Sequence, residues 1–196
     1  MHGRAVRGAA AALLAALLSA GLAAGLAGCG SVSIPFFGKK TEKPGAAAGG
    51  SACPVAVILR PLANTVVLGP SGEVKPLNAA WYGIYSDISA TCRVTGDVLH
   101  ATLDSVIIAE RGPAVRGNDV DLNYFVSLTA ADQTILGKKS FSVHVTVPDK
   151  AKRGGVDDHV EVAFPLGGRP LADLNITAGF QETPQAIEFY KTYRGR

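Results

Sequence analysis

Apolar and polar residues alternate with a period of two along most of the chain after residue 53. The alternation is clearest over 120–128, where every second residue from Val120 to Leu128 is apolar. Four further segments repeat it, over 99–107, 141–147, 160–164 and 174–180. This pattern is typical of β-strands that bury one side. Because glycine, proline and aspartate residues separate the segments, we expect seven or eight short strands joined by turns.

Strands with one polar and one apolar face are typical of antiparallel sheets, because parallel strands covered on both sides are apolar throughout. The chain is therefore predicted to form an all-β domain, an antiparallel β-sandwich of the immunoglobulin or fibronectin III type. A closed barrel is the main alternative. One short C-terminal helix is expected, since Thr183 can cap it and Pro184 suits its first position. Ile187 and Tyr190 are expected to face the sandwich, with Phe189 on another surface.

The first 28 residues have a different pattern. Arg4 and Arg7 precede an uncharged run over 9–27, which is the order found in export signals. The run closes with Leu26-Ala27-Gly28-Cys29, which looks like the lipobox of bacterial lipoproteins. We therefore predict cleavage before Cys29 and lipidation of that cysteine, with diacylglycerol joined to its thiol as a thioether and a further acyl chain such as palmitate on the same residue, which together anchor a protein stably. An ordinary secretory signal and an uncleaved membrane helix are the alternatives.

Composition divides the remaining chain into two parts. Residues 29–52 are rich in glycine, alanine and lysine and are predicted to form a flexible tether. Residues 53–196 have the size of one domain with one core. The residue after Cys29 is Gly30 and not the aspartate that resembles an inner-membrane retention signal. In a Gram-negative host this favours the periplasmic face of the outer membrane.

The charge of the chain argues against a nucleic-acid partner. The formal net charge is +3, from 19 basic and 16 acidic residues, and two of the basic residues lie in the predicted signal. The exported part is thus close to neutral and lacks the clustered basic face that nucleic-acid binding requires.

Once Cys29 carries lipid, Cys53 and Cys92 are the two cysteines left. An exported chain with one such pair is expected to form a disulfide, with two buried free thiols as the alternative. Cys53 is in phase with Val55 and Val57, and Cys92 with other apolar residues, so both thiols are expected on the buried sides of their strands.

No catalytic or cofactor motif is present that would predict an enzyme. His100 and His144 fall on the polar sides of expected strands. Asp157, His159 and Glu161 share one strand face and could contact a cation weakly, but a polar edge strand is the favoured interpretation. We therefore expect no catalytic residue, no cofactor and no metal site.

Aromatic residues are the better indication of function. Trp81, Tyr82 and Tyr85 cluster at the start of one strand, and Phe125 lies opposite the apolar face of another. Large aromatic side chains are common at protein interfaces, so these four are candidates for contact with a partner. Packing of Trp81 in the core of the sandwich is the alternative.

Three segments together resemble a group of proteobacterial lipoproteins of unknown activity. They are Ala109-Glu-Arg-Gly-Pro-Ala114, Asp121-Leu-Asn-Tyr-Phe-Val126, and Gly179-Phe-Gln-Glu-Thr-Pro-Gln185 followed by Tyr190. In that group a Cys-Pro start resembling Cys53-Pro54 follows a lipobox and a low-complexity tether. The resemblance implies an exported, lipid-anchored β-domain and assigns no site residues.

The expected function is that of a non-enzymatic envelope lipoprotein, anchored through Cys29, that binds a protein partner or assists envelope assembly. The alternative is a carrier of a lipid or another hydrophobic small ligand. A carrier requires an apolar cavity between the two sheets.

Overall fold

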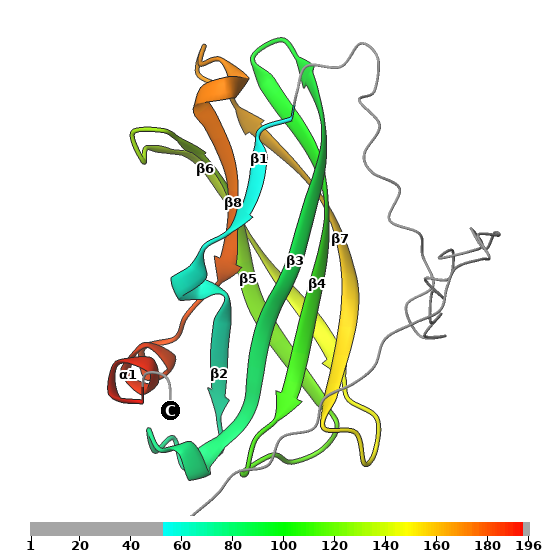
Figure 1. The fold of residues 1–196 in the computed structure, drawn as a ribbon, viewed down its shortest axis with the longest axis vertical. Helices are drawn as coiled ribbons and strands as arrows, with labels where there is room; N and C mark the ends of the chain where they lie inside the picture. The colour runs from blue at the N-terminus through cyan, green and yellow to red at the C-terminus, as the bar shows by residue number, and fades with distance from the viewer. Residues whose placement is uncertain (1–52, 194–196) are drawn as a thin grey trace, which may run out of the picture. The chain divides into compact units, whose positions relative to one another are not determined.

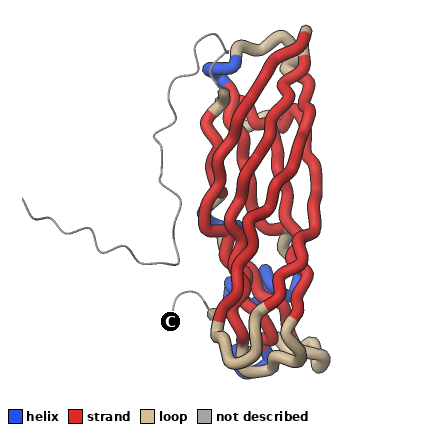
Figure 2. Tube along the Cα trace, turned by 90° about the vertical axis from the view of Figure 1, so that its right-hand side faces the viewer, coloured by secondary structure: helices blue, strands red, loops and turns tan. Residues whose placement is uncertain are grey.

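The computed structural model describes residues 53–193, so the predicted signal peptide, Cys29 and the predicted tether lie outside the described residues. Eight strands form two four-stranded sheets that pack face to face (Figure 1). The first sheet has the order β1-β8-β5-β6 and the second the order β2-β3-β4-β7. This arrangement confirms the predicted all-β sandwich with a short C-terminal helix. Loops gather at the two ends of the strands (Figure 2).

The first sheet contains β1 (Val55–Ile58), β5 (Asp119–Ala130), β6 (Ile135–Thr146) and β8 (Leu174–Phe180). The second contains β2 (Asn64–Leu68), β3 (Ala79–Thr95), β4 (Val98–Arg111) and β7 (Arg153–Pro165). Short 3-10 turns lie at η1 (Arg60–Leu62), η2 (Pro76–Asn78) and η3 (Leu171–Asp173), and the helix α1 spans Pro184–Thr192.

The chain changes sheets along one side of the sandwich. β1 pairs with β8 in the first sheet, the chain turns through η1, and β2 then pairs with β3 in the second sheet. Figure 1 shows the two short strands one above the other on this side. The β1–β8 pair is parallel, whereas every other pair is antiparallel. The expectation of a fully antiparallel fold therefore fails only at β1.

The alternating faces predicted from the sequence form the core. Leu99, Leu103, Leu122, Leu128 and Ile176 are almost completely buried, and each lies on a predicted apolar face. Two tyrosine hydroxyls inside the core also have partners, since Tyr85 bonds Ser105 at 2.7 Å and Tyr124 donates to Asp158. Buried polar groups cost little when they are hydrogen-bonded in this way.

The predicted disulfide is present and connects the two sheets. Cys53 lies just before β1 in the first sheet, Cys92 lies in β3 of the second, and their Cα atoms are 5.2 Å apart. The predicted phase of β1 is wrong, because Val55 and Val57 are 65% and 37% exposed. Ala56 and Ile58 pack against the core in their place. The strand begins only at Val55, so its alternation does not extend back through Cys53.

The helix α1 begins as predicted, but the predicted buried face is correct only in part, because Tyr190 packs against the sandwich and Ile187 does not. Thr183 Oγ1 accepts a hydrogen bond from the Ala186 amide at 3.1 Å, and Pro184 occupies the first turn. Ala186 and Phe189 are buried, whereas Ile187 is 44% exposed. The spacing of three residues places Ala186 and Phe189 on one side of the helix. No helix among residues 53–193 is long and apolar enough to cross a membrane.

Candidate functional site

The structure places most of the predicted aromatic contact residues inside the domain. Trp81 and Tyr85 are each 3% exposed and belong to the core. The Tyr85 ring meets the Tyr124 ring edge-on, with centroids 5.6 Å apart, and the Arg111 guanidinium lies 5.2 Å from the centre of the Trp81 ring. A partner therefore cannot reach these two side chains in the folded domain. Trp81 packs in the core, as its alternative interpretation expected, and the candidate contact role of Tyr85 does not fit its burial.

Phe125 and Tyr82 lie on outer faces of the sheets but are covered. The Phe125 side chain is 8% exposed, with the Lys138 ammonium 4.2 Å from its ring centre. Tyr82 packs against Phe189 of α1, with ring centroids 6.3 Å apart. Tyr82 is the only one of the four predicted contact residues that is not fully buried.

A partly apolar surface lies on the outer face of the first sheet, bordered by the exposed Lys138, which is opposite Ser127 in the strand register. We call it the β1 face and define it by seven residues: Val55, Val57, Ser127, Thr129, Ile135, Asn175 and Thr177. Strand register aligns four of them in one row across the sheet, because Asn175 is opposite both Val55 and Thr129, and Thr129 is opposite Ile135. The row ends in exposed apolar side chains, since Val55 is 65% and Ile135 is 60% exposed.

The hydroxyl groups of the β1 face are bonded to one another. Ser127 Oγ lies 2.7 Å from Thr177 Oγ1, and Thr129 Oγ1 lies 3.2 Å from the same atom. Ser127 and Thr177 are also almost fully buried beneath their neighbours. A ligand that covers this surface therefore does not have to replace water on these hydroxyls, which lowers the desolvation cost of binding.

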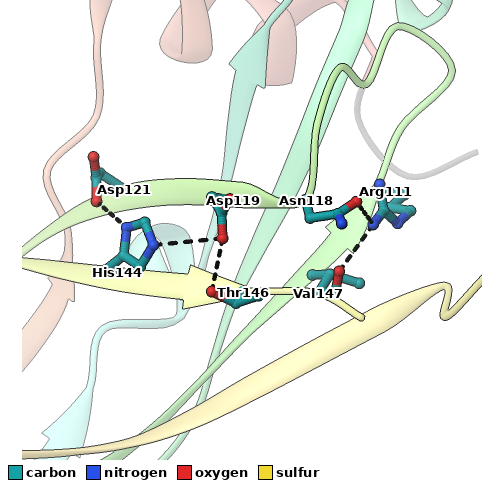
Figure 3. A network of polar contacts seen from close by, with 7 residues as sticks. All are labelled: Arg111, Asn118, Asp119, Asp121, His144, Thr146 and Val147. Atoms are coloured by element: carbon teal, nitrogen blue, oxygen red, sulfur yellow. Dashed lines mark hydrogen bonds and ion pairs between the residues drawn. The ribbon is translucent and has the colours of Figure 1, made fainter. Parts of the chain in front are cut away.

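The other end of the same sheet face is charged (Figure 3). His144 Nδ1 lies 2.8 Å from Asp121, and its Nε2 lies 3.5 Å from Asp119, which also accepts a hydrogen bond from Thr146 at 2.7 Å. The hydrogen bond with Asp121, followed by the charges of Asp121 and Asp119, raises the pKa of His144. All three charged side chains are more than half exposed, so their pairing contributes little stability.

His159 has the same environment on the second sheet. Its Nδ1 lies 2.8 Å from Asp104 across the β4–β7 pair, and this hydrogen bond is the main cause of the raised pKa of His159. The histidine thus pairs across the strands and not with Asp157 and Glu161 on its own strand. Among the described residues, no group of three or more His, Cys, Asp or Glu side chains is placed to hold a metal ion.

Arg111, the last residue of β4, has a structural role. Its Nη2 donates to Asn118 Oδ1 at 2.7 Å and to the Val147 carbonyl at 2.9 Å (Figure 3). Its Nη1 and Nε donate to the carbonyls of Gly117 and Ala151. One guanidinium therefore fixes the two loops that leave β4 and β6.

Glu182 was not predicted as a site residue, yet its carboxyl group has the most unusual environment. Its Oε2 accepts a hydrogen bond from Thr65 at 3.2 Å, and its Oε1 is buried without a hydrogen-bond partner. Burial raises the pKa of Glu182 to about 7. Nothing in the Gln-Glu-Thr-Pro segment signals this, because the burial arises from β2 and α1, which meet there only in the folded chain.

A search of protein-family models, curated proteins and solved structures found no match to this chain. The arrangement of its residues is therefore the basis for a functional proposal.

Proposed function

We propose that this chain is a lipid-anchored envelope protein whose β-sandwich binds a protein partner through the β1 face, without catalysis. The observation that carries the proposal is the row of uncharged residues that ends in the exposed side chains of Val55 and Ile135. The lipobox ending in Cys29 supports the anchor, and the Cys53–Cys92 disulfide is in keeping with an exported domain.

The physical properties of the β1 face suit a protein surface. Covering Val55, Val57 and Ile135 removes apolar area from water, and full burial of one such side chain contributes about 1.5–3 kcal/mol. The bonded hydroxyls of Ser127 and Thr177 lower the opposing cost. β1 is also the edge strand of its sheet, so a partner strand could extend the sheet there.

The lipid on Cys29 would raise the local concentration of the domain at one membrane, where a weak contact becomes effective. We place it on the periplasmic face of the outer membrane, because Gly30 follows Cys29. The carrier alternative has no support in the described residues. Side chains such as Tyr124, Phe164 and Phe180 fill the space between the sheets and are fully buried.

The proposal is tested with a photo-cross-linking amino acid placed at Val55 or at Ile135 in intact cells of the native host. We expect both positions to give the same cross-linked protein. The matched control is Asp157, an exposed residue on the outer face of the second sheet, which we expect to give none. Equal labelling from all three positions would overturn the assignment of the β1 face.

The anchor is tested separately in the same cells. Cys29→Ser is expected to remove lipid labelling, while the domain stays folded. Persistence of lipid labelling in Cys29→Ser would contradict lipidation at this cysteine and would leave the β1 face to be judged by its own cross-links.

A further inference from the structure

The helix α1 is held on the sandwich by a small group of contacts. Val66 and Ala79 of the second sheet and Ala186 and Phe189 of the helix form a separate buried cluster on the outer side of β2 and β3. Five partly buried apolar or aromatic residues that border this cluster complete the contact on both sides: Leu68, Val74, Tyr82, Tyr190 and Tyr193. A cluster of this size gives the helix limited docking energy, so a single unfavourable group can change its docking.

Glu182 is such a group, and it lies in the short connection between β8 and α1, which we call the hinge. It occupies the short segment between the last residue of β8, Phe180, and the cap of α1, Thr183. A hydrogen bond from Thr65 on β2 holds the carboxyl group, while Oε1 is buried with no partner. An ionised carboxylate there has one hydrogen bond for two oxygens, and a buried charge without full compensation is costly.

The groups that face Glu182 do not compensate that charge. Tyr190 lies beside it on α1, and Tyr82 faces Tyr190 from β3. Asp121 of β5 and Thr65 of β2 line the hollow next to the hinge. Burial raises the pKa of Tyr82, and the negative charge of Glu110 on β4 raises that pKa further. These groups are neutral or acidic, and within residues 53–193 no ion pair involves Glu182.

We propose that Glu182 is a protonation-sensitive latch for the C-terminal helix, which stays docked while the carboxyl group is neutral and is released when it ionises. Release of α1 uncovers Val66, Ala79 and Tyr82 on the second sheet. The latch would thus control access to Tyr82, the one predicted contact residue that α1 covers. This inference does not depend on the lipid anchor or on the β1 face.

The direction of the pH effect follows from the two states of the carboxyl group. Its ordinary pKa is 4.5, and burial raises the pKa in the docked state to about 7. The docked helix is therefore favoured most below pH 4.5, and this advantage is lost as the pH rises to about 7. Because the carboxyl group is only half buried, we expect the opening constant to rise about tenfold between pH 5 and pH 7.5, less than the full shift implies.

Amide hydrogen exchange of the full-length chain in detergent measures this opening directly. The rates of the α1 amides are corrected for intrinsic base catalysis and compared with those of β4. We expect α1 alone to open more at pH 7.5 than at pH 5. An α1 opening constant that stays the same over this range would overturn the latch.

Two isosteric variants identify the group responsible. In Glu182→Gln the side chain is always neutral, so the opening constant is expected to stay at its low-pH value. Glu188→Gln, an exposed position on the same helix, is the matched control and is expected to keep the pH dependence. Persistence of the pH dependence in Glu182→Gln would show that another group controls the helix.

Discussion

The main core and the cluster under α1 differ in how their residues are held in place. In the main core, both sheets contribute long strands, such as β5 of the first sheet and β4 of the second, and a disulfide connects the sheets. The cluster under α1 has four buried residues, one of them the large ring of Phe189. The nine-residue helix above it is too short to be stable alone in water.

This difference shows which part of the domain can respond to conditions. Opening the main core exposes both sheets at once, so it occurs only with global unfolding. The helix can leave while the sandwich stays folded, because its buried contacts are with β2, β3 and the loop that contains Val74. We therefore expect substitutions in the main core to lower the stability of the whole domain. Substitutions in the cluster under α1 should mainly weaken the docking of the helix.

The largest effect is expected from Phe164→Ala. Phe164 is 1% exposed and packs against Gly137, which has no side chain to fill the space that is left. We expect the free energy of global unfolding to fall by about 4 kcal/mol. Urea unfolding followed by the fluorescence of Trp81, the only tryptophan, measures it. A loss below about 1 kcal/mol would show that the core repacks freely.

Removal of the disulfide is expected to rank second. The Cys53→Ser, Cys92→Ser double variant opens a loop with a sequence separation of 39 residues. The chain-entropy model gives about 3.9 kcal/mol as an upper value for the loss in the free energy of unfolding, because residual structure in the unfolded chain reduces the entropy gained. Reduction of the wild-type chain in the same urea titration should give the same midpoint. Two different midpoints would mean that the serines, and not the missing bond, cause the change.

Phe189→Ala is expected to affect the helix and spare the sandwich. The ring is 5% exposed but lies at the edge of the domain, so we expect a loss of about 2 kcal/mol in helix docking. Exchange of the α1 amides should accelerate, while that of β4 should change much less. Equal acceleration in both elements would show that the two clusters unfold as one unit.

Thr183→Ala should have the smallest effect. Its hydroxyl is the N-cap of α1, and loss of such a cap costs about 1 kcal/mol. We expect faster exchange in the first turn of the helix at every pH, because the cap does not titrate. Thr183→Ser, which keeps the hydroxyl, is the control and should exchange like the wild type.

The sandwich could be predicted from the sequence because its strands are long and each has one face against the opposite sheet. Alternation over 99–107 and 120–128 therefore reports burial directly. The same rule failed at β1, a four-residue edge strand whose Val55 and Val57 point outward. Four residues are too few for alternation to distinguish the two faces, and the parallel partner β8 is distant in sequence.

The candidate surfaces were harder to predict, for two physical reasons. Large aromatic residues serve both cores and interfaces, so Trp81 and Tyr85 could not be assigned before the packing was known. Glu182 becomes unusual only because β2 and α1 close over it. The pattern also misassigned Ile187 of α1, where Phe189 faces the sandwich in its place, since a nine-residue helix with apolar residues on two sides does not indicate which side is buried.

The position of the disulfide also determines how the domain would carry mechanical force. Tension applied through the N-terminal segment reaches the domain at Cys53, directly before the four-residue β1. The bond to Cys92 passes that load into β3, a 17-residue strand held by β2 and β4 on its two sides. With the bond intact, β1 is shielded and the load is shared across a sheet. With the bond reduced, β1 would peel away from β8 first, at a lower force.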